Sequence, residues 1–112
     1  MELAARIDEL WESGTLDAAP IEEAIELLDR GEVRVAERHE DRWTVNEWTK
    51  KAILLYFRLR KVEPMDVGGL HFLDKIPVKS DYAAHGVRVV PPGVARYGSF
   101  LSEGVVLMPG FV

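Results

Sequence analysis

Residues 94–112 read VARYGSFLSEGVVLMPGFV and repeat with a period of six. The large apolar residues that keep this spacing are Val94, Phe100, Val106 and Val112. The glycines that keep it are Gly98, Gly104 and Gly110. A period of six matches neither the 3.6-residue turn of a helix nor the two-residue alternation of a strand. It is typical of a chain that turns a corner after each short strand, with a small residue where the backbone bends. The segment therefore predicts a hexapeptide-repeat β-helix.

The predicted β-helix is short. Each coil has three sides, so residues 94–111 make one coil and Val112 begins the next. A solenoid needs roughly three or more units to bury its apolar face, and a lone coil leaves a strand edge unpaired. We therefore expect residues 87–112 to be the start of a longer β-helix, preceded by a mainly helical N-terminal domain over residues 1–86.

The composition is typical of an ordinary folded protein. The chain has 112 residues, of which 47% are hydrophobic and 29% are charged, enough for one domain with a modest core. It has no cysteine, which excludes disulfides and cysteine-bound zinc. No apolar run approaches the ~20 residues of a membrane span, and the acidic start does not resemble a signal peptide. We therefore expect a cytoplasmic protein with no membrane partner.

Charge is distributed unevenly along the chain. Residues 1–47 carry 14 acidic and 5 basic side chains, whereas residues 48–112 carry 5 acidic and 9 basic ones. The acidic half predicts a solvated surface, and the basic half would attract an anionic ligand. Nucleic acid is not an expected partner, because the basic residues are scattered and the whole chain is acidic.

Apolar spacing predicts two helices near the N-terminus. The first covers about residues 3–13 and ends near Gly14. Asp17 is a suitable cap for the second helix, and Gly31 ends it. A short hairpin then follows, with its polar turn at residues 40–41.

A third helix is predicted after Asn46, a suitable N-cap. Its expected buried stripe consists of Trp48, Ala52, Leu55 and Leu59. Because residues 53–57 are apolar on a second side, we expect this helix to be covered on two faces or to pack against another chain. Residues 62–70 contain a proline and two adjacent glycines and predict a loop. Residues 71–86 are expected to be irregular or extended.

Few residues form a pattern that carries chemistry. His39, His71 and His85 are widely separated and none pairs with a carboxylate at metal-ligand spacing, so no metal site is expected. The chain has no serine in a nucleophile elbow and no phosphate-binding glycine loop. The pattern therefore predicts no catalytic residue and no cofactor-binding residue.

Three cations stand among apolar residues and prolines, where the backbone has little freedom. They are Lys75, Lys79 and Arg88. The pattern alone favours ordinary solvated charges at all three positions. Arg88 is the best candidate for ligand binding, because it directly precedes the predicted β-helix and a guanidinium grips a carboxylate with two hydrogen bonds.

These residues together resemble a known family. The run Val87-Arg88-Val89-Val90-Pro91-Pro92, with the hexapeptide segment after it, is similar to tetrahydrodipicolinate N-succinyltransferase of bacterial lysine biosynthesis. Residues 74–79 (DKIPVK), 33–37 (VRVAE) and 48–52 (WTKKA) agree with the same family. The resemblance covers almost the whole chain and is weakest in the first two helices.

The resemblance implies an α+β architecture: a small helical N-terminal domain with a short hairpin, then the first coil of a left-handed parallel β-helix, assembled as a homotrimer. The implied reaction transfers succinyl from the co-substrate succinyl-CoA to the amino group of L-2-amino-6-oxopimelate, the opened form of tetrahydrodipicolinate. The resemblance assigns dicarboxylate binding to Arg88. It places the family's site aspartate and the coils of the CoA groove beyond Val112, so we expect the chain alone to be inactive. The link from Lys79 to Arg88 is shorter than in many members, which leaves Lys79 without a role.

Two other functions remain open on the sequence. One is a stand-alone helical interaction module whose apolar tail adds to a partner's sheet edge. The other is a hexapeptide acyltransferase with a different acceptor. A stable monomer with a cooperative melt would favour the module, whereas aggregation or mixed oligomers would favour a truncated solenoid.

Overall fold

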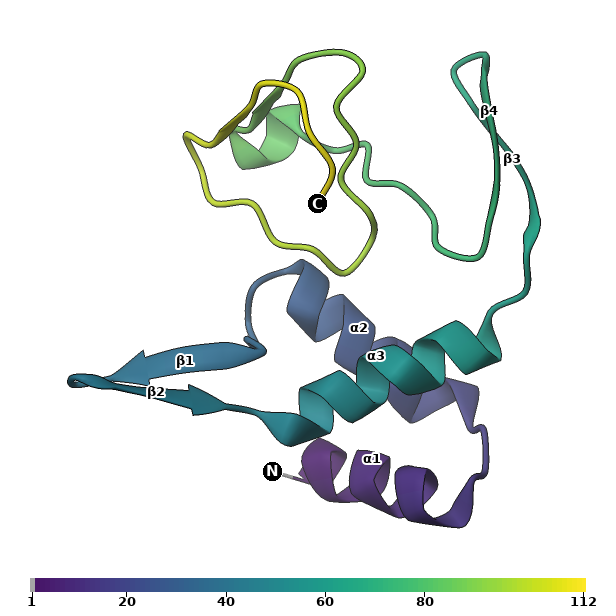
Figure 1. Ribbon diagram of the computed structural model, residues 1–112, viewed down its shortest axis with the longest axis vertical. Coiled ribbons are helices and arrows are strands. Elements are labelled where there is room, and N and C mark those ends of the chain that lie inside the picture. Colours follow the sequence, from purple (N-terminus) through teal and green to yellow (C-terminus); the bar gives the residue numbers. More distant parts are fainter. Residues whose placement is uncertain (1) are drawn as a thin grey trace.

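The computed structural model describes residues 2–112, which form three helices, two hairpins and a C-terminal loop (Figure 1). The elements in chain order are α1 (Glu2–Ser13), α2 (Ala18–Asp29), β1 (Ala36–His39), β2 (Arg42–Val45), α3 (Glu47–Leu59), β3 (Glu63–Val67), β4 (Leu70–Asp74), the 3-10 turn η1 (Ala83–His85), β5 (Arg88–Val89) and β6 (Val106–Leu107). The helices lie together at one end of the molecule, and the C-terminal loop winds above α2 and α3. Among the described residues, no helix combines the length and hydrophobicity needed to cross a membrane.

The three predicted helices are confirmed, and they share one core. Its helical side chains are Ile7, Leu10, Ile21, Ala24, Ile25, Leu28, Ala52, Leu55 and Tyr56. These positions recur every three or four residues, so each helix buries one apolar stripe against the other two. The stripe of α3 differs from the prediction: Thr49 and Tyr56 are buried, while Trp48 and Leu59 lie at its half-buried border. The buried face of α3 is therefore rotated by about one residue from the predicted one.

The predicted caps lie at the right positions but do not act through their side chains. Asp17 precedes α2, yet it makes no side-chain cap and instead accepts a hydrogen bond from Arg6 Nη2 at 3.0 Å. Asn46 precedes α3, and its Nδ2 donates to the backbone oxygen of Arg34 at 2.7 Å. Asp17 is therefore the N-cap residue of α2, as predicted, but its carboxylate binds the guanidinium on α1, a charged partner, and not the helix backbone.

The hairpin at residues 36–45 is confirmed, with β1 and β2 antiparallel and Ala36 opposite Val45. The prediction of a loop over residues 62–70 is wrong, since β3 and β4 form a second antiparallel hairpin there. Gly68 and Gly69 make its two-residue turn with φ of +57° and +90°. Such a turn needs positive φ at both central residues, which glycine adopts without a steric penalty.

The C-terminal segment makes one closed circuit and returns beside itself. Arg88 pairs in parallel with Val106, and Val89 with Leu107, eighteen residues further along. A second parallel bridge joins Val94 to Phe111, seventeen residues along, and the N–H of Val112 donates to the oxygen of Val94 at 3.0 Å. Three six-residue units therefore separate Arg88 and Val89 from their neighbours in space, and the second bridge is one residue shorter.

Candidate functional site

Arg88, the predicted substrate-binding residue, lies exposed on β5 at the start of the C-terminal circuit. Its backbone is held firmly, because its N–H donates to Val105 at 3.0 Å and the N–H of Val90 donates to Leu107 at 2.9 Å. The preceding Val87 is buried. Within residues 2–112 the guanidinium of Arg88 makes no hydrogen bond and no ion pair. The structure thus presents a fixed arginine whose donors face solvent.

Lys79 is buried at the junction of α2 and the C-terminal circuit, with 8% of its side chain exposed. Its ammonium lies 3.0 Å from Oδ1 of Asp29 and donates to the backbone oxygens of Asp29 and Ser99 at 3.3 and 2.6 Å. The N–H of Gly98 donates to the same carboxylate oxygen at 2.8 Å. Because an ammonium has three donors, Lys79 is fully occupied and joins two parts of the fold.

Lys75 is also engaged with the protein. Its ammonium donates to the backbone oxygen of Phe57 at 3.0 Å, close to the C-terminus of α3. Arg60 makes a second contact with the same residue: its Nε donates to the backbone oxygen of Lys75 at 3.1 Å. A cation at this end of a helix complements the helix dipole. The interpretation of Lys75 and Lys79 as solvated charges is therefore wrong.

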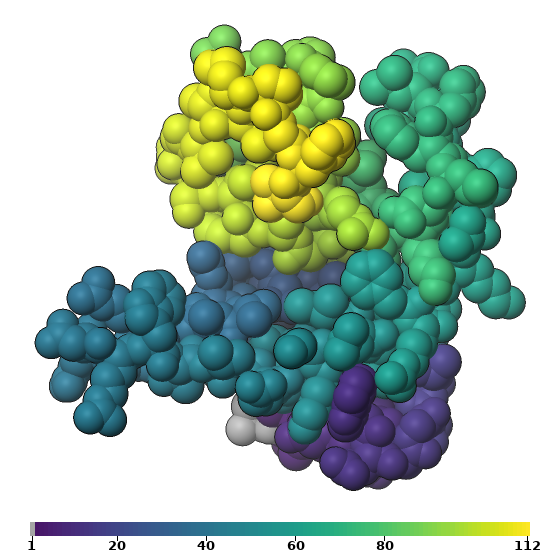
Figure 2. All heavy atoms as spheres, viewed as in Figure 1, coloured from purple at the N-terminus to yellow at the C-terminus, as the bar shows by residue number. Residues whose placement is uncertain are grey.

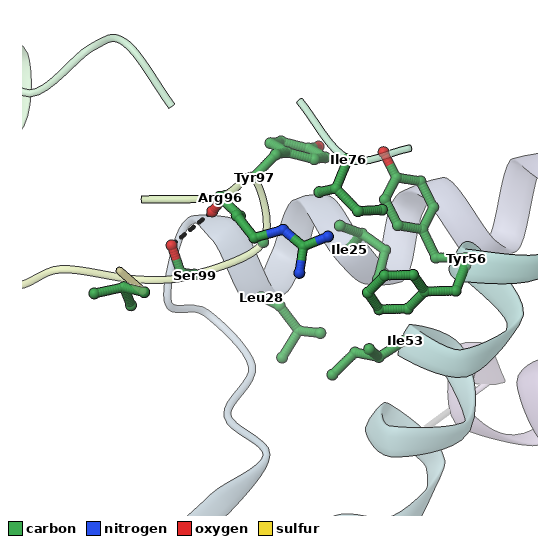
Figure 3. A pocket seen from close by; sticks show the side chains of 11 residues that line it. Ile25, Leu28, Ile53, Tyr56, Ile76, Arg96, Tyr97 and Ser99 are labelled. Carbon is green, nitrogen blue, oxygen red and sulfur yellow. Dashed lines mark hydrogen bonds between the residues drawn. The ribbon is translucent and has the colours of Figure 1, made fainter. Parts of the chain in front are cut away.

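A cavity of about 230 Å³ lies between α2, α3 and the C-terminal circuit (Figure 3). The residues that line it are Ile25, Leu28, Ile53, Tyr56, Phe57, Ile76, Arg96, Tyr97, Gly98, Ser99 and Val112. Arg96 is one of these residues, with its Nη2 3.2 Å from Oδ2 of Asp74 and its guanidinium 5.3 Å from the centre of the Phe57 ring. The lining is mostly apolar, and Arg88 is not part of it.

The electrostatics of this junction are those of a structural contact. Burial raises the pKa values of Tyr56 and Tyr97, so both hydroxyls stay neutral. The backbone N–H of Lys75 is the main cause that lowers the pKa of Asp74, and Arg96 lowers it further. None of these groups faces a nucleophile or base of its own, so the junction shows no arrangement for proton transfer.

The histidines lie apart from one another. His39 is 3.3 Å from Glu37 on the first hairpin, and His85 is 2.9 Å from Asp81 beside η1. His71 is exposed on β4. Within residues 2–112, no three side chains of His, Cys, Asp or Glu lie close enough together to hold a metal ion.

Comparison with known proteins gives the chain its family. Residues 2–59, which carry the three helices and the first hairpin, match the family model described as tetrahydrodipicolinate N-succinyltransferase N-terminal. The match covers more than half of the chain. The chain belongs to this family.

Curated relatives agree over a longer stretch. The 2,3,4,5-tetrahydropyridine-2,6-dicarboxylate N-succinyltransferase of Burkholderia multivorans is 47% identical, and those of Burkholderia mallei and Burkholderia pseudomallei are 48% identical. Each alignment covers 98% of this chain and 46% of the relative. The chain thus spans about half the length of the curated relatives it matches. The aligned regions are 126 positions long, so the relatives carry extra residues inside them.

Sequence reasoning missed the residues that attach the C-terminal circuit to the helices. Asp29 is the last residue of α2 and carried no local signal beyond a charge at a helix end. Asp74 lies in residues 74–79, which carry part of the family resemblance, but its partner Arg96 lies 22 residues away in the sequence. The assignment of Arg88 to substrate binding stays a prediction, and its side chain does not line the cavity described above.

Proposed function

We propose that this chain is the N-terminal part of a succinyl-CoA-dependent N-succinyltransferase that acts on tetrahydrodipicolinate, in its opened form L-2-amino-6-oxopimelate. The reaction belongs to the succinylase route of diaminopimelate and lysine biosynthesis. One observation carries the proposal: 47–48% identity, over 98% of this chain, to relatives named for that transfer. Acceptors other than tetrahydrodipicolinate are disfavoured for the same reason.

The C-terminal circuit is proposed to be the first coil of a left-handed parallel β-helix. The parallel pairing of Arg88 with Val106 at an offset of eighteen residues supports this. Three sides of six residues give the same offset, and six is the period of the sequence. We therefore divide the chain into a mainly helical domain at residues 1–86 and a β-helical part that begins at residue 87.

Arg88 is proposed to hold a carboxylate of the acceptor. The acceptor is a dicarboxylate, and a guanidinium binds a carboxylate through two parallel hydrogen bonds. Three features of Arg88 support this role: a backbone paired with β6, a buried neighbour in Val87, and a guanidinium without a protein partner among the described residues. A fixed backbone with free donors is what a binding arginine requires.

The proposed reaction depends more on positioning the amine than on activating the thioester. The acceptor's amine attacks the thioester carbonyl, the C–N amide bond forms and the C–S bond breaks, and CoA leaves as a thiol with the proton that the amine gives up. Because the thioester is already activated, orientation of the amine supplies much of the acceleration. A general base from outside these residues would take the proton. We propose a cytoplasmic homotrimer, with the CoA groove formed outside this chain.

A chimera tests the proposal. Residues 1–112 would replace the aligned region of the Burkholderia multivorans relative, and CoA thiol release from succinyl-CoA would be followed with and without tetrahydrodipicolinate. We expect acceptor-dependent release by the chimera and none by the 112-residue chain alone. The unmodified relative is the positive control. A chimera that assembles like the relative yet releases no thiol in an acceptor-dependent way would overturn the proposal.

A further inference from the structure

Residues 77–87 lead into Arg88 and lie against the C-terminal circuit, which sits directly on the helical body (Figure 2). This segment first runs antiparallel to the circuit, where Val78 pairs with Arg96. The 3-10 turn η1 then reverses the chain and delivers it to β5. The position of Arg88 therefore depends on how this turn is attached to the circuit.

Tyr82 immediately precedes η1 and bonds in two directions. Its backbone oxygen accepts the N–H groups of His85 and Val87 at 3.1 and 3.0 Å, which closes the turn directly before Arg88. Its hydroxyl oxygen accepts the N–H of Ala95 at 3.3 Å. Ala95 is fully buried. One half-buried tyrosine thus joins the turn before Arg88 to the buried backbone of the circuit.

The other polar contacts of the turn do not depend on side chains that reach the circuit. His85 and Asp81 lie 2.9 Å apart, but this pair stays within the turn and both side chains are about half exposed. The oxygen of Gly86 accepts the N–H of Gly104 at 2.9 Å, a bond between two backbones. Among the hydrogen bonds of the described residues, the Tyr82 hydroxyl is therefore the side-chain donor or acceptor that attaches residues 82–87 to the circuit.

We propose that Tyr82 is a positioning residue for Arg88. Its hydroxyl fixes the turn on Ala95 and so sets the direction in which the guanidinium meets a carboxylate of the acceptor. The strand that carries Arg88 has only two residues and pairs with β6 alone, so the turn before it supplies the remaining support. A two-pronged grip on a carboxylate tolerates only small errors in direction. The inference rests on the binding role proposed for Arg88.

Steady-state kinetics of the active chimera test the inference. Tyr82→Phe keeps the ring but leaves the buried N–H of Ala95 without its acceptor. We expect the KM for tetrahydrodipicolinate to rise about threefold, a typical coupling between residues in one network. The KM for succinyl-CoA should stay unchanged.

Thr49→Val is the matched control, because it also removes one hydroxyl hydrogen bond. Thr49 is fully buried in α3, and its Oγ1 donates to the backbone oxygen of Asn46 at 2.6 Å. This variant should lower the melting temperature of the chimera without changing either KM. A loss of stability alone is thereby separated from a loss of positioning.

A double variant shows whether the hydroxyl acts through the arginine. In the Arg88→Lys background the aligned grip is already lost, so adding Tyr82→Phe should leave the KM for tetrahydrodipicolinate unchanged. The same threefold rise in both backgrounds, or no rise in Tyr82→Phe when Arg88→Lys alone raises this KM, would overturn the inference by itself. A chimera without acceptor-dependent thiol release would overturn the proposed function and this inference together.

Discussion

The carboxylate of Asp29 joins three parts of the chain. It ends α2, it lies 3.0 Å from the ammonium of Lys79, and it accepts the N–H of Gly98 at 2.8 Å. Lys79 lies 50 residues further along the chain, and Gly98 lies 69 residues further. This one side chain therefore holds the C-terminal circuit against the helices.

Removal of that carboxylate should destabilise the protein strongly. Asp29→Ala leaves the buried ammonium of Lys79 without a counter-ion and the N–H of Gly98 without an acceptor. We expect a loss of about 3 kcal/mol in the free energy of unfolding, because an uncompensated buried charge is costly. Urea unfolding followed by circular dichroism measures it.

The paired control removes both charges. Asp29→Leu with Lys79→Met replaces the ion pair by apolar groups of similar size, which restores much of the stability because no charge remains buried. A double variant as unstable as Asp29→Ala would show that the ion pair itself, and not the unpaired charge, carries the effect.

The contact between Gly31 and Phe100 gives a second prediction. Gly31 has φ of +72°, and a Cβ there would lie 2.7 Å from the Phe100 ring. Gly31→Ala therefore combines backbone strain with a steric clash. Gly14→Ala is the matched control, since Gly14 has the same φ but open space around it.

Thermal unfolding of the two variants separates these effects. We expect about 1–2 kcal/mol of destabilisation from Gly14→Ala, the cost of a left-handed conformation for an L-residue. Gly31→Ala should cost clearly more. Similar melting temperatures for both variants would argue against close packing of Phe100 on the end of α2.

The lowered pKa of Asp74 gives a third prediction. Its causes are the backbone N–H of Lys75 first and then the charge of Arg96, and the ordinary value is 3.8. Because the folded state binds this proton less tightly than the unfolded chain, the carboxylate stabilises the fold above that value. The stabilisation is lost as the pH falls through the lower, folded pKa.

Asp74→Asn should therefore lower stability at neutral pH and flatten the loss of stability below about pH 4. Denaturant unfolding at a series of pH values measures both effects. Asp41→Asn, at the exposed turn of the first hairpin, is the control and should leave the profile unchanged. An unaltered acid profile in Asp74→Asn would count against the Asp74–Arg96 contact.

Local patterns predicted the local parts of this fold well. The apolar spacing of the helices and the polar turn at residues 40–41 are properties of neighbouring residues. The three helices and the first hairpin could therefore be predicted from them. The six-residue period likewise agrees with a circuit that returns beside itself after eighteen residues. The second hairpin was missed although its signal was present. Gly68 and Gly69 were interpreted as a loop, whereas adjacent glycines between two apolar runs also make a tight hairpin turn.

The contacts that attach the circuit to the helices were not predictable from local patterns. Lys79 and Asp29, like Arg96 and Asp74, come together only after the elements have docked. A single charged residue in a sequence does not reveal a partner that lies tens of residues away. For the same reason Lys79 was interpreted as a solvated charge, although it is buried.

The binding role of Arg88 is the central claim, and steady-state kinetics of the active chimera test it most directly. Arg88→Lys keeps the charge but loses the two-pronged grip on a carboxylate. We expect the KM for tetrahydrodipicolinate to rise about tenfold, the equivalent of one charge-assisted hydrogen bond. The KM for succinyl-CoA should stay unchanged, and Arg42→Lys on the first hairpin, as control, should alter neither. An unchanged KM for tetrahydrodipicolinate in Arg88→Lys would contradict the account.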